Sequence, residues 1–92
     1  MGVLESGVFT QSVTNDTLTI TESMGVKRVS IFNASAVTGT AAGGQALGAL
    51  SSAAVNIAED DTLTVDAIEA SVIKELTITS PSGCTLTVIA IV

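Results

Sequence analysis

The sequence contains no His, no Trp and no Tyr, and its single cysteine is Cys84. Without His, the common Ser-His-acid and Cys-His nucleophilic arrangements cannot form. One Cys and no His also fall short of the ligands that a zinc site needs. A lone cysteine makes no internal disulfide, so Cys84 is predicted to be a small buried residue on a strand, with an intermolecular disulfide as the alternative. These absences favour a protein that is not an enzyme and that holds no cofactor or metal.

Charge is also scarce, with nine acidic and three basic residues and a net charge of −6. Lys27, Arg28 and Lys74 form no cluster in the sequence, and phosphate contacts need clustered Lys and Arg. Nucleic acid is therefore not an expected partner. No apolar run reaches the roughly 18 residues of a membrane helix, and the N-terminus lacks a basic segment followed by an apolar one. Neither a membrane partner nor an export signal is expected.

Aromatic residues are limited to Phe9 and Phe32, although 47% of the 92 residues are hydrophobic. The core must therefore consist of Val, Ile, Leu and Ala, with both Phe side chains predicted to join it. Aromatic side chains bury the most area per residue, and a chain of this length leaves much of its surface unburied. Such a domain often needs a partner subunit for stability. We therefore expect a homo-oligomer.

Alternating apolar and polar residues fill the sequence, and the pattern occurs twice. Residues 16–20 (DTLTI) return at 61–65 (DTLTV), 26–31 (VKRVSI) at 73–78 (IKELTI), and 37–40 (VTGT) at 84–87 (CTLT). The first match has an offset of 45 residues and the other two an offset of 47. Alternation of this kind is typical of half-buried strands. The repeat therefore indicates two similar halves of strands that close on each other.

The strand patterns and turn signals predict about eight strands in one domain. The predicted strands are 8–13, 17–22, 27–33, 37–41, 54–58, 62–66, 73–79 and 84–92, with turns at 14–16, 59–61 and 80–83. Residues 1–7 are predicted to be an N-terminal arm, and the small residues of 41–54 a connecting loop. The expected fold is all-β: a small antiparallel β-sandwich or jelly-roll-like barrel spanning 8–92.

Two features suggest sites. Glu59, Asp60 and Asp61, with Asp66 nearby, offer oxygen ligands for Ca²⁺, but the spacing of a calcium loop is absent and a solvated turn is the preferred interpretation. Residues 84–92 carry apolar side chains on both faces, so this strand is predicted to be buried on both sides. Apolar residues there, in the arm and in the loop are predicted to form interfaces: Val3, Leu4, Leu47, Leu50, Ile89, Ile91 and Val92.

The style of residues 17–20 (TLTI), 26–33 (VKRVSIFN) and 76–83 (LTITSPSG) resembles small virion accessory proteins of tailed bacteriophages. These are capsid decoration proteins, head-fibre bases and tail accessory domains. The resemblance is one of composition and rhythm over most of 8–92. It implies a non-enzymatic and often trimeric subunit, assembled in the host cytoplasm, that docks on a major capsid or tail protein and remains in the virion. It transfers no functional residue.

Two other functions remain open from the sequence. One is a non-catalytic ligand-binding or adhesin-type β-sandwich module, which would need a concave face with stacking aromatics or a metal. The other is a pilin-like fibre subunit that pairs through an exposed strand edge, against which the missing export signal counts.

Overall fold

The computed structural model describes residues 7–43, 54–67 and 72–92. They form an all-β fold with one short 3₁₀ turn, η1. The elements are β1 (Val8–Thr21), η1 (Glu22–Met24), β2 (Arg28–Asn33), β3 (Gly39–Ala42), β4 (Val55–Ile57), β5 (Thr62–Asp66) and β6 (Glu75–Ile91). All strand pairs are antiparallel, in the order β4-β3-β6-β2-β5 with β1 on β6.

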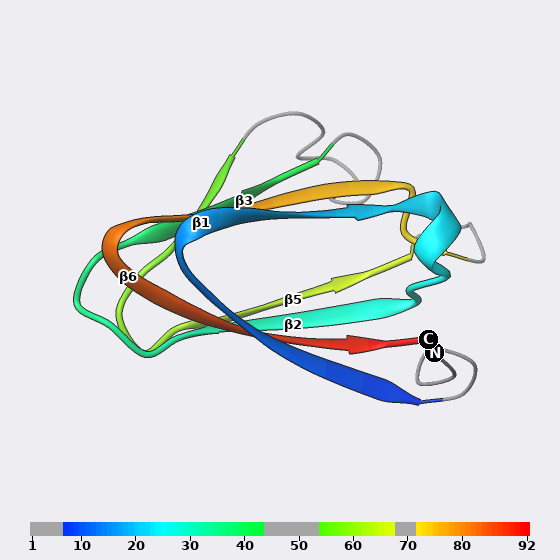
Figure 1. The fold of residues 1–92 in the computed structure, drawn as a ribbon, viewed down its shortest axis with the longest axis horizontal. Helices are drawn as coiled ribbons and strands as arrows, with labels where there is room; N and C mark the ends of the chain where they lie inside the picture. The colour runs from blue at the N-terminus through cyan, green and yellow to red at the C-terminus, as the bar shows by residue number, and fades with distance from the viewer. Residues whose placement is uncertain (1–6, 44–53, 68–71) are drawn as a thin grey trace.

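The sheet curls over on itself because β1 and β6 are both long and both bend (Figure 1). The upper layer contains β4, β3, residues 75–80 of β6 and residues 16–21 of β1. The lower layer contains β5, β2, residues 85–91 of β6 and residues 8–14 of β1. The predicted all-β fold is confirmed. The structure has six strands instead of the predicted eight, because β1 and β6 are bent strands that each span two of the predicted ones.

The internal repeat is present in the strand pairing as well as in the sequence. Thr40 pairs with Thr79, and 47 residues away Thr87 pairs with Phe32. Likewise Leu18 pairs with Ile78, and their counterparts Leu63 and Ile31 pair with each other. The two halves therefore have the same pairing register, which means that the upper and lower layers are structural counterparts.

Each layer takes strands from both halves of the chain. The first half supplies residues 16–21 and β3 to the upper layer, and residues 8–14 and β2 to the lower layer. The second half supplies β4, β5 and the two arms of β6 in the same way. The halves therefore interleave, and neither half forms a sheet of its own.

The predicted turns at 14–16 and 80–83 are bends within strands. Asn15 has a positive φ of 51° and Gly83 one of 86°, the left-handed region that Gly and Asn tolerate best. The register of β1 on β6 shifts between Thr14 and Asp16, as at a bulge. The turn residues bend both strands together, so the chain does not reverse. The counterpart of Asn15, Asp60 with a φ of 67°, lies in the true turn between β4 and β5.

The core lies between the layers and is aliphatic, as predicted. Cys84 is fully buried among it, and Phe9 packs against it from the edge. Phe32, in contrast, is 38% exposed, because alternation along β2 turns it away from its buried neighbour Ile31. The buried hydrophobic residues are Val13, Ile20, Val26, Val29, Ile31, Ala41, Ile57, Val65, Ile73, Leu76, Ile78, Cys84, Leu86, Val88 and Ala90.

Two buried polar residues, Asn33 and Ser80, occupy equivalent positions in the two halves. The Asn33 amide nitrogen donates to the carbonyl of Val37 at 2.9 Å and to that of Ile57 at 2.8 Å. The Ser80 hydroxyl donates to the carbonyl of Cys84 at 2.6 Å. Val37 and Cys84 are also 47 residues apart. Each half therefore has an equivalent hydrogen bond, from the side chain of Asn33 or Ser80 to the carbonyl four residues later.

Candidate functional site

The outer side of the lower layer is the candidate site, and we call it the lower outer face. Residues alternate between core and solvent along a strand, and the register of the four strands places the solvent-facing ones side by side. The face contains Val8, Thr10, Ser12, Thr14, Arg28, Ser30, Phe32, Thr62, Thr64, Asp66, Thr85, Thr87, Ile89 and Ile91. Most of them are hydroxyl or aliphatic residues.

An apolar strip crosses this face. Val8 is 56% exposed, Ile89 39%, Ile91 38% and Phe32 38%, and these are four of the five exposed large hydrophobic side chains in the described part of the chain. Val8 lies directly opposite Ile91, and Ile89 follows two residues away on the same side of β6. Phe32 pairs with Thr87, which makes it the diagonal neighbour of Ile89. The four side chains therefore form one contiguous strip.

The internal repeat provides a built-in comparison for this strip. On the outer side of the upper layer, Thr79 stands at the position equivalent to Phe32, and Ala42 at the position equivalent to Ile89. The described residues on that side include no apolar side chain larger than Ala; they are Thr17, Thr19, Thr21, Thr40, Ala42, Ala54, Asn56, Glu75, Thr77 and Thr79. The fold therefore tolerates a threonine surface at these positions, and the apolar strip is not needed to form the sheet.

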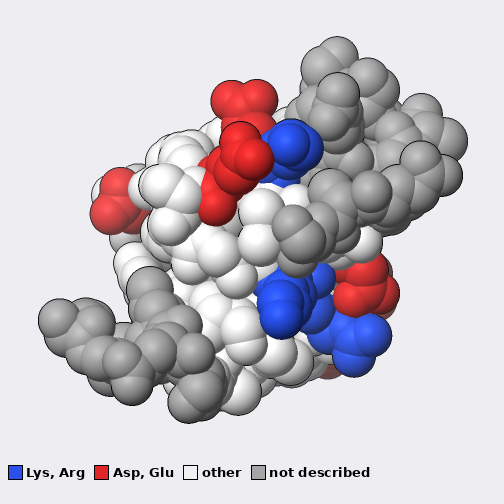
Figure 2. Space-filling view, turned by 90° about the vertical axis from the view of Figure 1, so that its right-hand side faces the viewer, with Lys and Arg blue, Asp and Glu red and all other residues white. Residues whose placement is uncertain are grey.

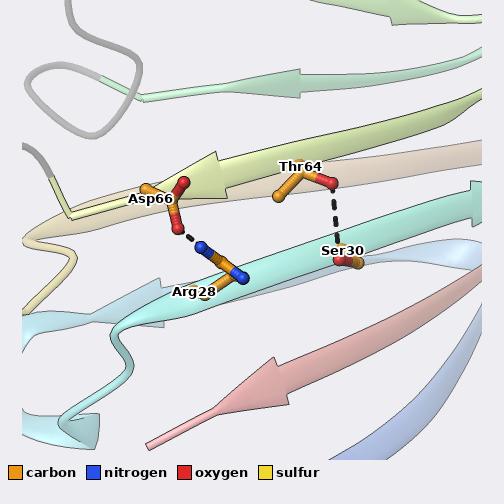
Figure 3. A network of polar contacts seen from close by, with 4 residues as sticks. All are labelled: Arg28, Ser30, Thr64 and Asp66. Atoms are coloured by element: carbon orange, nitrogen blue, oxygen red, sulfur yellow. Dashed lines mark hydrogen bonds and ion pairs between the residues drawn. The ribbon is translucent and has the colours of Figure 1, made fainter.

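A polar cluster closes one side of the lower outer face (Figure 3). The Arg28 guanidinium donates to the Asp66 carboxylate at 2.6 Å, and the hydroxyls of Ser30 and Thr64 lie 3.4 Å apart. The hydrogen bond to Asp66 and its negative charge raise the pKa of Arg28 above its ordinary value. Both side chains of the ion pair are about half exposed, so water screens it and it contributes little to stability. The pair leaves the face without net charge.

Of the other charged residues, Lys27 lies at the end of the strip, where its backbone N–H donates to the Ile91 carbonyl at 2.7 Å. Lys74 contacts Glu22 at 3.1 Å, and Figure 2 shows Lys and Arg side chains next to Asp and Glu at this end of the molecule rather than in a continuous basic patch. Glu59 and Asp60 form the turn before β5. In the described ranges, no group of three or more His, Cys, Asp or Glu residues is placed to hold a metal ion.

The structure places only some of the predicted interface residues. Ile89 and Ile91 lie on the apolar strip, whereas Val92 is half-buried and packs against the core. The single chain does not bury the last strand on both sides, because Ile89 and Ile91 face outward. The four others, Val3, Leu4, Leu47 and Leu50, lie outside the described residues.

Sequence reasoning missed Val8 and Phe32 as surface residues. The signal for Phe32 was available, because it alternates in step with Arg28 and Ser30 rather than with Val29 and Ile31. Its repeat counterpart, Thr79, gives the same indication. Val8 carried no such signal, since its exposure depends on the register of β1 against β6.

Within the described ranges, no helix is long and apolar enough to span a membrane. Comparisons of the chain with protein-family models, with curated proteins and with solved structures find no match.

Proposed function

We propose that the chain is a non-enzymatic structural subunit that oligomerises and docks on the surface of a larger assembly through the lower outer face. The observation that carries the proposal is the apolar strip, two positions of which, Phe32 and Ile89, are threonine and alanine in the equivalent layer. Exposed apolar patches of this kind mark interaction sites. Hydroxyl side chains border the strip, which suits contact with another protein surface.

The assembly that we propose is the virion of a tailed phage, in which the lower outer face contacts a major capsid or tail protein. Support comes from the resemblance in strand style, the aromatic-poor core and the scarcity of charge. A protein covered by neighbours needs few charged residues, because burial of charge is costly at an interface core. The role is decoration or stabilisation of the particle surface.

Replacing Ile89 and Ile91 with threonine tests the docking face. We expect particle binding to fall at least tenfold, because the variant replaces two of the four apolar side chains of the strip, Ile89 and Ile91. Threonine suits an exposed strand position, so the free energy of unfolding should change by less than about 1 kcal/mol. Binding is measured by co-sedimentation with the heads and tails of the phage whose genome encodes the chain.

The control is Thr77→Ala with Thr79→Ala, which changes two outward side chains of the other arm of β6 on the opposite face. This variant should bind like the unaltered chain. Equal binding by the Ile89 and Ile91 variant would contradict the proposal. So would a saturable calorimetric response to glycans or Ca²⁺ without particle binding, which would favour a ligand-binding module.

A further inference from the structure

Residues 8–14 of β1 form an outer edge of the lower layer. Their partner among the described residues is β6, on one side only. An edge strand carries a row of backbone N–H and C=O groups that another extended chain can pair with. Proteins usually protect long edges with Lys, Pro or a covering segment, and residues 8–14 contain neither Lys nor Pro.

The hydrogen bonds determine which backbone groups point outward. The Val92 N–H donates to the Gly7 carbonyl at 3.0 Å, and hydrogen-bonded pairs alternate with non-hydrogen-bonded pairs along an antiparallel ladder. Phe9, Gln11 and Val13 therefore bond to β6. The backbone groups that point away from the sheet belong to Val8, Thr10, Ser12 and Thr14.

Charge distinguishes this edge from the others that the structure describes. Residues 8–14 include no ionisable side chain. The upper arm of β1 begins at Asp16 and is followed by Glu22, so antiparallel self-pairing about its middle would oppose carboxylates. The β5 edge follows Asp61 and ends at Asp66, and β4 is only three residues long. The 8–14 edge is the one that a second copy of a chain with net charge −6 approaches without opposing carboxylates.

We propose that a second copy of the chain pairs with this edge, its residues 8–14 running antiparallel to those of the first across a two-fold axis at Gln11. This register places Thr10 opposite Ser12 of the partner subunit and Val8 opposite Thr14 of the partner subunit. It is the register that engages every outward-pointing backbone group of the segment. Each facing pair then exchanges two hydrogen bonds.

The same register matches the inner side of the strand. Phe9 is half-buried at the edge of the core, and the pairing places it opposite Val13 of the partner subunit. The pairing therefore covers the exposed part of Phe9 on each side of the axis, where Gln11 meets its own copy. An antiparallel pair closes with two-fold symmetry, so the expected particle is a dimer rather than the trimer that the sequence resemblance implies. The edge shares Val8 with the apolar strip, but the pairing uses backbone groups of residues 8–14 and not the side chains of Ile89, Ile91 and Phe32, so it does not depend on the docking proposal.

The first test is the mass of the full chain in solution by sedimentation equilibrium, where we expect twice the 9.2 kDa of one chain. Thr10→Pro removes an outward N–H without breaking a bond to β6 and should raise the dissociation constant at least tenfold. The matched control is Thr64→Pro on the opposite edge. Its N–H also points outward, because the Asn33 N–H and the Lys27 carbonyl bond to Asp61 and Ala67. A monomer, a trimer or an equal loss in both variants would overturn the proposal.

Charge substitutions test the register itself at exposed positions. Thr10→Lys with Ser12→Lys places lysines opposite lysines across the two-fold axis and should raise the dissociation constant of the dimer at least tenfold. Thr10→Lys with Ser12→Glu places opposite charges there and should retain the dimer. Since both variants alter the same two exposed side chains, misfolding cannot produce opposite results. Dissociation of both, or of neither, would contradict this register, whether or not the protein binds phage particles.

Discussion

Replacing Asn33 with alanine is expected to lower the free energy of unfolding by about 3–5 kcal/mol. The change leaves the carbonyls of Val37 and Ile57 without their donor and removes the acceptor of the Ser35 N–H. A buried polar group without a partner costs about 1–3 kcal/mol. Domains of this kind are stable by only about 5–15 kcal/mol, so the variant should be close to unfolding at room temperature. Urea denaturation followed by circular dichroism measures the difference.

The repeat supplies two controls for this prediction. Ser80→Ala removes a single bond, to the Cys84 carbonyl, and should cost only about 1–2 kcal/mol. Asn33→Ser installs the side chain that the second half uses at the equivalent position, and should fall between the unaltered chain and Asn33→Ala. A loss below about 1 kcal/mol for Asn33→Ala would show that water replaces the amide and that the network is not a structural requirement.

Substitution of Gly39 by alanine is the second change with a large expected effect, about 1–3 kcal/mol of destabilisation. A Cβ atom at Gly39 would lie 2.8 and 2.9 Å from the terminal carbons of Leu86 and 3.2 Å from the sulfur of Cys84. Gly39 and Leu86 are repeat counterparts, 47 residues apart. The large side chain of one half therefore fills the space that the small residue of the other leaves. Thermal or urea unfolding measures the loss.

A double-mutant cycle separates overpacking from other effects. Leu86→Ala alone should cost about 2–5 kcal/mol, because it leaves a cavity. Combined with Gly39→Ala, the added methyl enters that cavity, so the double variant should be at least about 1 kcal/mol more stable than the sum of the two changes predicts. Additive losses would mean that the two residues do not share space in the way that the structure indicates.

Much of the fold was predictable from the sequence, because alternation and repetition are local signals. The alternation of residues 28–33 predicted the buried Val29 and Ile31, and that of residues 84–90 predicted the buried Cys84, Leu86 and Val88. The sequence predicted turns at Asn15 and Gly83, but it could not show that the chain only bends there and does not reverse. A turn residue reverses a chain or only bends it according to whether the partner strand continues beside it, and the partner is far away in sequence.

The candidate site was less predictable, because it depends on pairing between distant strands. The sequence predicts Ile89 and Ile91 as interface residues from their apolar character alone, whereas their place beside Val8 and Phe32 follows from the register of β6 with β1 and β2. The repeat positions already showed Thr79 and Ala42 where the other half has Phe32 and Ile89. A comparison of the two halves position by position therefore indicates, without knowledge of the register, that the fold does not require apolar side chains at Phe32 and Ile89.

The central position of β6 also determines when the protein can fold during synthesis. β1, β2 and β3 all hydrogen-bond to β6, which the ribosome makes after them. Until residues 75–91 leave the exit tunnel, neither layer has its middle strand, and the earlier strands remain a nascent chain with exposed apolar side chains. The delay is short at about 5–20 residues per second, but it makes early release or ribosome stalling within β6 the step at which this chain is most exposed to aggregation and to cellular proteases.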